Sequence, residues 1–450
     1  MSNEFAKAFD SANYEHKLPP WHDRPCKPSN IPAATQRAID VYMMSQKPNG
    51  EMGGIGWWQT ANGYTAMALH DKWAGQRHNY PKIAEVMKKC EQECHNGFIN
   101  EFNDDTLWWG LLCCHMFELE KDVWFIAKAK AIWQHIKTGK SVCGKGQYQF
   151  NGQDMEGAVF WTTRPGEGQI NSITTGLFAQ LSARLALIEQ KRGDSNKSAH
   201  GQVNGRPSSK GSTDEKERDR RGSWRGFGGF LNHAQKNIKE ASSAAGVMSR
   251  QAKIENYIST ARTALAWILR CRYKPREAVV LDTIRLKKQE AVDWTFTYLT
   301  GVTLGACALM FEATREKLFM TLACHMAHRA MRNPGWVEGD GVLTEHGSYG
   351  RGKHDPMKNN DSVGFKSVLI RELGILLAII RRTACALPEA KIEEQLIAKF
   401  LAINYEALQN RNCNANGQYG PWWAGPMEYP TSHSQMAVLD VMAAARLIDR

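Results

Sequence analysis

A helical spacing of apolar residues runs through most of this chain and constrains its fold more than any other feature. Apolar residues recur every three or four positions in about twelve segments, whereas no convincing run alternates between apolar and polar residues as a half-buried strand does. The pattern therefore predicts an all-α protein. The predicted helices span residues 33–44, 61–69, 83–90, 107–119, 123–136, 173–188, 258–269, 297–311, 318–331, 368–380, 392–408 and 435–448.

The connections between these segments alternate in length and character. Three of them, at 71–80, 118–122 and 312–317, are short and polar. Short turns at one end and long loops at the other indicate helical hairpins whose long loops gather on one face. Six hairpins that close on themselves would form an (α/α)6 toroid, which accommodates 450 residues in one domain. The long connections are rich in glycine, tryptophan and polar residues and span 48–59, 96–105, 140–171, 333–365 and 412–433.

Two segments lie outside this plan. Residues 1–32 are polar and contain five prolines, so we expect a surface arm that precedes a single helical domain at 33–450. The domain is interrupted by a low-complexity insertion at 191–253, whose first part almost lacks aliphatic residues. Such a segment buries too little apolar surface to offset the entropy of ordering, so we expect a disordered insertion between two helices.

The net charge and the cysteine content indicate which kinds of binding partner and which cellular compartment to expect. The net charge is +11, but basic residues are scattered over helix faces without the basic, aromatic-interleaved stripe of a nucleic-acid binder. Eleven cysteines in mostly apolar contexts fit free thiols of a reducing compartment better than a metal site. The N-terminus has no pattern of a secretory signal, and no apolar run is long enough for a transmembrane segment. We therefore expect a cytoplasmic protein that binds no nucleic acid and no metal, and leave its oligomeric state open.

An aspartate pair, Asp104-Asp105, precedes an apolar run that opens with the tryptophans Trp108 and Trp109. One interpretation is structural: Asp105 is the N-cap of the helix that follows. The other is catalytic, because a glycosidase uses two carboxyl groups and apolar surfaces that bind sugar rings. The local sequence at 100–109, taken alone, favours the interpretation of Asp105 as an N-cap.

Other long loops carry the same residue types as this one. Tryptophan and tyrosine faces bind the apolar side of a pyranose, while amides and carboxylates take its hydroxyls. Because the long loops are expected on one face, the pattern indicates a carbohydrate-binding groove. We expect no organic cofactor, since no step of glycoside cleavage requires one. The candidate residues in these other loops are Trp57, Trp58, Asn62, Trp161, Asn171 and Trp422.

The blocks around these residues resemble glycoside hydrolase family 76, the endo-α-1,6-mannanases and related fungal cell-wall proteins. The segment from Phe98 to Trp109 is close to the family's aromatic-Asp-Asp-x-x-Trp-Trp signature, and the resemblance covers nearly the whole chain outside the arm and the insertion. The other blocks follow in the family's order and span 57–62, 157–161, 171–185, 361–371, 410–412 and 419–426.

The resemblance implies an (α/α)6 fold and a retaining mechanism in which Asp104 is the nucleophile and Asp105 the general acid/base. Asp104 would then be ionised and Asp105 protonated, with mutual repulsion and the neighbouring indoles favouring the neutral form of Asp105. The resemblance also adds Tyr298, Phe365 and Lys366 to the residues expected to contact sugar. The expected ligand is an α-mannan-like carbohydrate or a glycosylated small molecule.

The chain also departs from the family pattern. Leu299-Thr300 replaces an Asn-Gln pair that would bind sugar hydroxyls, the loop 157–161 lacks one glycine and one tryptophan, and Ser367 replaces a glycine. These changes leave the aspartate pair intact but touch the expected mannan subsites. They keep two alternatives open: a tailoring hydrolase of a fungal secondary-metabolite pathway, and a catalytically silent carbohydrate-binding member of the fold.

Overall fold

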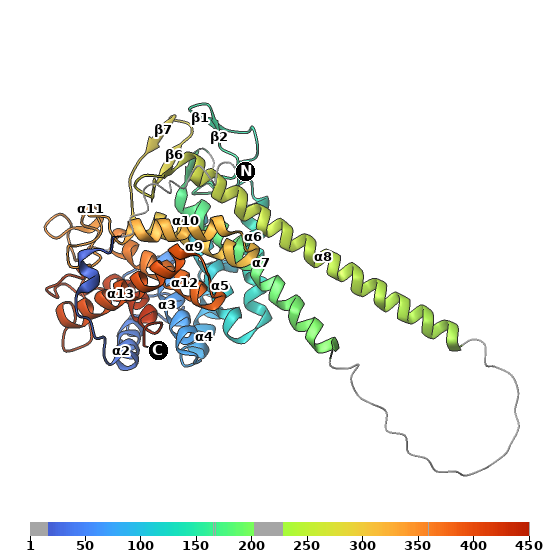
Figure 1. The fold of residues 1–450 in the computed structure, drawn as a ribbon, viewed down its shortest axis with the longest axis horizontal. Coiled ribbons are helices and arrows are strands. Elements are labelled where there is room, and N and C mark those ends of the chain that lie inside the picture. The colour runs from blue at the N-terminus through green and yellow to red at the C-terminus, as the bar shows by residue number, and fades with distance from the viewer. Residues whose placement is uncertain (1–16, 165, 167, 202–227, 359, 450) are drawn as a thin grey trace, which may run out of the picture. The chain divides into compact units, whose positions relative to one another are not determined.

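A computed structural model describes residues 17–164, 166, 168–201, 228–358 and 360–449 (Figure 1). The chain divides into two compact units, one formed by Met1–Arg184 with Ile258–Arg450 and the other by Leu185–Tyr257. The first unit carries every candidate site residue. In the part of the chain that the structure covers, no helix is long and apolar enough to cross a membrane.

Helices dominate the structure, as the sequence predicts, and every predicted segment overlaps one long helix. The all-α prediction is therefore confirmed. The long helices are α2 (Ile31–Met43), α3 (Trp57–Ala74), α4 (Tyr80–Glu93), α5 (Asn103–Glu120), α6 (Val123–Thr138), α7 (Ser172–Gly201), α8 (Gly228–Cys271), α9 (Thr297–Thr314), α10 (Lys317–Ala330), α12 (Ser362–Thr383), α13 (Pro388–Arg411) and α14 (Ser432–Ala445), with short helices η2 (Pro20–Asp23), η3 (Asn96–Phe98) and α11 (His346–Tyr349) between them.

Six of these helices form a closed inner ring in the order α3, α5, α7, α9, α12 and α14. α3 packs on α5, α9 on α12 and α12 on α14, and the ring closes where α14 packs on α3. Gly110 of α5 lies against Leu181 of α7, and the Gln180 side chain of α7 donates to the Val302 carbonyl of α9 at 2.9 Å. The outer helices pair with this ring as α2–α14, α3–α4, α5–α6, α9–α10 and α12–α13. The predicted toroid is confirmed.

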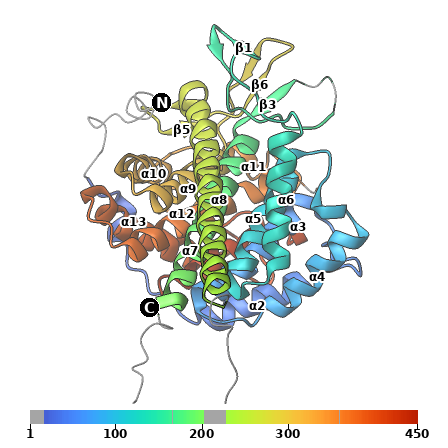
Figure 2. The ribbon, with the colours of Figure 1, turned by 90° about the vertical axis from the view of Figure 1, so that its right-hand side faces the viewer.

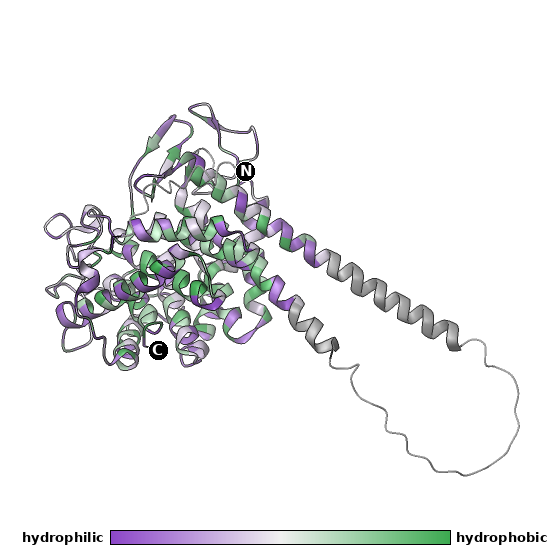
Figure 3. Cartoon of the chain, in the orientation of Figure 1, coloured by the Kyte–Doolittle hydropathy of each residue, from purple (hydrophilic) through white to green (hydrophobic). Residues whose placement is uncertain are grey.

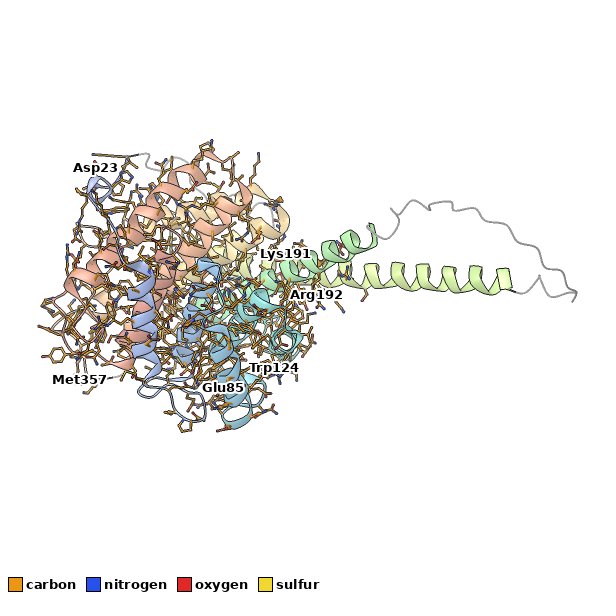
Figure 4. The ribbon with its side chains drawn as sticks, turned by 90° about the horizontal axis from the view of Figure 1, so that it is seen from below. Asp23, Glu85, Trp124, Lys191, Arg192 and Met357 are labelled. Carbon is orange, nitrogen blue, oxygen red and sulfur yellow. The ribbon has the colours of Figure 1, made fainter. Side chains whose placement is uncertain are left out.

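The two rings differ in how their helices are buried. Outer helix α4 buries only one stripe, formed by Ile83, Val86, Met87 and Cys90, and its Glu85 points outward (Figure 4). Inner helix α9 is buried on all sides along most of its length, from Thr297 to Phe311. The hydropathy colouring shows the same contrast, with apolar residues concentrated on the central helices (Figure 3).

The direction of the chain decides where the long loops lie. Each short turn joins the end of an inner helix to the start of an outer one, so each long connection leads into the start of an inner helix. The predicted gathering of long loops at one end follows from this order. The sequence analysis missed one such connection, residues 272–296 between α8 and α9. This connection contains apolar residues, as the helices do, so composition did not distinguish it from them.

Short strands are a second feature that the sequence analysis missed. The strands are β1 (Gln149–Phe150), β2 (Gln153–Asp154), β3 (Gln169–Asn171), β4 (Tyr273–Lys274), β5 (Val279–Val280), β6 (Thr283–Arg285) and β7 (Glu290–Val292). They form the antiparallel sheets β1-β2, β3-β6-β7 and β4-β5. Strands of two or three residues are too short to show an alternating pattern. Figure 2 shows β1, β3 and β6 together at one end of the first unit.

Helices extend into both ends of the predicted insertion at 191–253. Helix α7 continues to Gly201 and α8 begins at Gly228, and inside the second unit Gly193 of α7 faces Arg250 of α8. Polar residues can continue a helix that has already begun, because adding a residue to a helix costs less than starting one. The composition of this segment alone did not reveal these helix extensions. The middle of the predicted insertion, residues 202–227, lies outside the described residues.

The N-terminal arm runs along α13 in its described part. Trp21 is buried against Phe400, with ring centroids 5.5 Å apart, and the Tyr405 hydroxyl donates to the Ser29 carbonyl at 2.8 Å. These contacts attach the described part of the arm to α13. Residues 1–16 of the predicted arm lie outside the described residues.

A buried ion pair links three inner helices in the centre of the ring. Arg371 of α12 donates from Nε and Nη2 to the two carboxylate oxygens of Asp440 of α14, each at 2.8 Å. Arg371 also donates to the side-chain oxygen of Asn62 and, at 3.1 Å, to its carbonyl on α3. All three residues are buried.

We expect Arg371→Met to lower the free energy of unfolding by about 3–5 kcal/mol, because Asp440 would be left in the interior without its partner, where burial already raises the pKa of its carboxyl group. The double variant Arg371→Met/Asp440→Leu should recover most of this loss. Urea denaturation followed by circular dichroism measures both. Arg285→Met, which breaks an exposed pair with Glu290, is the matched control and should cost less than about 1 kcal/mol. A loss of that size in Arg371→Met would contradict the central role of this pair.

Candidate active site

The aspartate pair lies in the first turn of α5. The N-cap of α5 is Phe102, with an extended backbone and no side-chain cap, so the interpretation of Asp105 as the N-cap is wrong. A carboxylate in the first turn is stabilised by the positive end of the helix macrodipole. The main-chain N–H of Asp105 donates to Oδ1 of Asp104 at 3.0 Å.

Each carboxylate receives a hydrogen bond from a different side chain. The Trp161 indole Nε1–H donates to Oδ2 of Asp104 at 3.0 Å, and the Asn100 amide donates to Oδ2 of Asp105 at 2.8 Å. Asn100 is itself fixed, because its side-chain oxygen accepts from the Phe102 N–H at 3.0 Å. The pair is therefore held from two separate loops, those that precede α5 and α7.

Burial raises the pKa of both carboxyl groups. The pKa of Asp104 lies well above its usual range, first because of burial and then because of the neighbouring charge of Asp105. Burial raises the pKa of Asp105 to about 6, against the Asn100 hydrogen bond and with the charge of Asp361 adding to the rise. The pair thus retains a proton near neutral pH. The sequence analysis expected that proton on Asp105, and because burial raises the pKa of both groups, this expectation stays a prediction.

A cavity of about 290 Å3 opens at the aspartate pair. Its lining comes from the starts of α3, α5, α7, α9 and α12 and from the loops before them. Eight of the residues predicted from the sequence line it: Trp58, Asp104, Asp105, Trp108, Trp161, Asn171, Tyr298 and Phe365.

Aromatic rings form much of the cavity wall. Tyr298 and Phe365 stack with their centroids 4.1 Å apart and their planes at 9°. Trp58 lies 6.3 Å from Phe365 and 6.2 Å from Trp108, which connects the three rings along the wall. Such a wall offers apolar faces to the C–H side of a pyranose.

Five predicted site residues do not line this cavity and are packed in the interior instead. Adjacent residues of a helix point about 100° apart, so one member of each pair Trp57/Trp58, Trp108/Trp109 and Phe365/Lys366 faces the cavity and the other the interior. Trp57 and Trp109 stack on each other at 4.2 Å. The remaining interior residues are Asn62, which contacts Arg371, Lys366, which lies beside Trp423, and Trp422, which packs on Tyr349.

Six further residues line the cavity without having been selected from the sequence: Phe102, Gln169, Ile173, Asp282, Thr283 and Asp361. Asp361 accepts from the Gln59 amide at 2.8 Å and from the Trp58 indole at 3.3 Å. Burial raises the pKa of Asp282 to about 6. Asp361 begins one of the blocks that resemble the family, so the sequence offered a signal by which it could have been selected. Asp282 follows an apolar run in the connection 272–296, which the sequence analysis did not identify.

Three of the departures from the family pattern, Leu299, Thr300 and Ser367, lie away from the cavity, whereas the fourth lies in the loop 157–161 that carries the cavity residue Trp161. Leu299 is buried in α9, and Thr300 accepts from the Val280 N–H at 3.1 Å through its hydroxyl. Ser367 is buried and its hydroxyl donates to the Gly364 carbonyl at 2.7 Å. None of the three lines the cavity, so they support the α9 and α12 scaffold.

Metal ligands are not clustered in the described residues. No group of three or more His, Cys, Asp or Glu side chains there is arranged to hold a metal ion. The sequence-based expectation that no cofactor takes part stays a prediction.

Comparison with known proteins places this geometry in a family. No curated protein sequence matches the chain. An inactive variant of the α-1,6-mannanase GH76A of Salegentibacter sp. HEL1_6, with two consecutive aspartates replaced by alanine and in complex with α-1,6-mannotetrose, has a similar structure at 18% identity and a TM-score of 0.67, covering 93% of this chain and 100% of that one.

Dfg5 from Chaetomium thermophilum in complex with glucosamine is similar at 14% identity and a TM-score of 0.61, covering 94% of this chain and 92% of that one. At these identities the likeness shows the fold. The family model described as glycosyl hydrolase family 76 matches residues 31–198 and 231–450. Because these two stretches make up most of the chain, this protein belongs to glycosyl hydrolase family 76.

Proposed function

We propose that this protein is a retaining glycoside hydrolase or transglycosylase that acts on α-1,6-linked mannose-containing glycans through Asp104 and Asp105. The observation that carries the proposal is the buried aspartate pair at an aromatic-lined cavity, with a separate hydrogen-bond donor for each carboxylate. Family membership supports glycosidase chemistry in general. The mannanase structures that resemble this chain support the linkage and the sugar.

In the proposed first step, a carboxylate oxygen of Asp104 attacks the anomeric carbon and Asp105 gives its proton to the departing glycosidic oxygen. The covalent glycosyl ester on Asp104 is then cleaved by water or a sugar hydroxyl, from which Asp105 takes the proton back. The hydrogen bonds from Trp161 and from the Asp105 N–H favour the anionic form of Asp104. They act against burial and favour the shared proton on Asp105.

A second candidate substrate is a glycan with an amino sugar at the cavity. Four carboxyl groups, those of Asp104, Asp105, Asp282 and Asp361, line the cavity together with no lysine, arginine or histidine. A protonated amine would be attracted by such a site. The similar structure of Dfg5 holds glucosamine. The tailoring hydrolase and the silent binding protein remain alternatives that the experiments below address.

Covalent trapping tests the roles of the two aspartates. A 2-fluoro-mannosyl fluoride should label Asp104, and Asp104→Asn should abolish labelling, as read by peptide mass spectrometry. Asp105→Asn should lower kcat/KM on α-1,6-mannan by about 10²–10⁴-fold, because it removes general acid–base catalysis. Asp23→Asn, at an exposed aspartate, is the control. A chain that binds mannosides but is neither labelled nor active would be the silent member of the fold.

Asn100→Ala should shift the alkaline limb of the pH profile of kcat/KM to higher pH. The Asn100 hydrogen bond favours ionised Asp105, so its loss raises the pKa of the acid and keeps it protonated to higher pH. Initial rates between pH 4 and 9 on α-1,6-mannan measure the shift. Asn416→Ala, at an exposed loop position, should leave the profile unchanged. A shift to lower pH would contradict this role of Asn100.

Competition by monosaccharides separates the two substrate candidates. If an amino sugar occupies the cavity, glucosamine should inhibit more strongly than mannose, and its advantage should grow from pH 5 to 7 as Asp282 ionises. Asp282→Asn should reduce that advantage severalfold. Stronger inhibition by mannose at every pH would favour the mannan substrate.

A further inference from the structure

Trp294 is an exposed indole whose backbone contacts Asp282, a residue that lines the cavity. It lies between β7 and α9, in the long connection that the sequence analysis missed, and is 60% exposed. Single exposed apolar residues are common on protein surfaces and need no function. The position of Trp294 relative to the cavity is what distinguishes it.

The backbone around Trp294 is held in place by the cavity wall. The Trp294 carbonyl accepts from the N–H of Asp282, a cavity residue, at 3.1 Å. The buried Arg272 guanidinium donates to the Val292 carbonyl and to Oδ1 of Asp293, each at 2.9 Å. Thr283, also a cavity residue, pairs with Val292 in the sheet. The exposed indole is therefore presented from a fixed backbone.

A continuous chain of aromatic rings leads from the cavity to Trp294. Phe365 and Tyr298 line the cavity, and Phe296 packs on them at 5.1 Å and 6.0 Å. Trp294 packs edge-on against Phe296, with ring centroids 5.9 Å apart. Trp294 is the outer, solvent-facing end of this chain.

We propose that Trp294, with Phe296 and the flanking Asp293, forms an outer sugar subsite that binds a hexose residue of a glycan whose reacting residue lies in the cavity. This inference rests on the proposed glycosidase function and specifies how the same site takes long substrates. The cavity of about 290 Å3 is slightly smaller than the roughly 300–1,000 Å3 of small-molecule sites, so a longer glycan would extend beyond it. The Asp293 side chain is 56% exposed and offers a carboxylate to sugar hydroxyls beside the indole.

The test is a titration of Asp105→Asn, which preserves the cavity and slows turnover, with α-1,6-mannobiose and α-1,6-mannohexaose. The same titration is repeated with Trp294→Ala, Trp294→Phe and Val123→Ala added to this background. Val123 is an exposed apolar residue at the start of α6, at the end of the toroid opposite the long loops. Isothermal calorimetry gives the affinities, and the indole ¹⁵N–¹H signal of Trp294 reports contact directly.

We expect Trp294→Ala to weaken mannohexaose binding by about three- to tenfold, the value of one aromatic stacking contact, and to leave mannobiose binding unchanged. Trp294→Phe should recover most of the loss, and Val123→Ala should change neither affinity. The indole signal of Trp294 should shift with mannohexaose and not with mannobiose.

Three outcomes would overturn the subsite. Equal hexaose affinities with and without Trp294 would show that the indole contacts no sugar. An equal loss for both ligands would show that Trp294 supports the cavity wall. If neither ligand binds to Asp105→Asn with Trp294 present, the mannan proposal itself fails and the subsite fails with it. The first two outcomes differ from this one because in them Asp105→Asn with Trp294 present still binds mannohexaose.

Discussion

The buried pair of Arg371 and Asp440 is the interaction on which the rest of the site depends. It joins α12 to α14, and through Asn62 it reaches α3. The Arg371 guanidinium also lies over the ring of Trp108 on α5, 5.8 Å from its centroid. Trp108 is part of the cavity wall, so a central charge pair supports the surface on which sugar would rest. Removing one partner of such a buried pair costs several kcal/mol, because the other partner stays buried without compensation. We infer that the pair therefore favours this arrangement of the four helices over others.

The topology of the toroid explains why acidic residues are tolerated in the cavity. Inner helices begin at the end where the long loops lie, so the positive ends of several helix macrodipoles face the same space. Asp104 and Asp105 lie in the first turn of α5, and Asp361 is the N-cap of α12. These dipoles stabilise carboxylates without a basic side chain among the lining residues. The cavity therefore stays open to sugar hydroxyls or to a cationic ligand.

The separate anchoring of the two aspartates bears on the mechanism. Asp104 is held by Trp161 from the loop before α7, whereas Asp105 is held by Asn100 from the loop before α5. Burial keeps a proton on the pair, and the proposed reaction requires that proton on Asp105. Displacement of water by substrate strengthens every hydrogen bond in the cavity, and we infer that the bonds donated to Asp104 then favour the proton on Asp105.

The sequence by itself determined the helices, their order, the alternation of short and long connections and the aspartate pair, because each is encoded in local periodicity and residue type. Tertiary structure decided which member of each neighbouring pair faces the cavity, since Trp57 and Trp58 look alike in sequence and differ only in direction on α3. It also brought Asp282 to the cavity, with Trp294 bonded to it, through strands too short to leave a pattern. The places of Leu299 and Thr300 in the interior likewise depend on how α9 is rotated in the ring, which no local signal specifies.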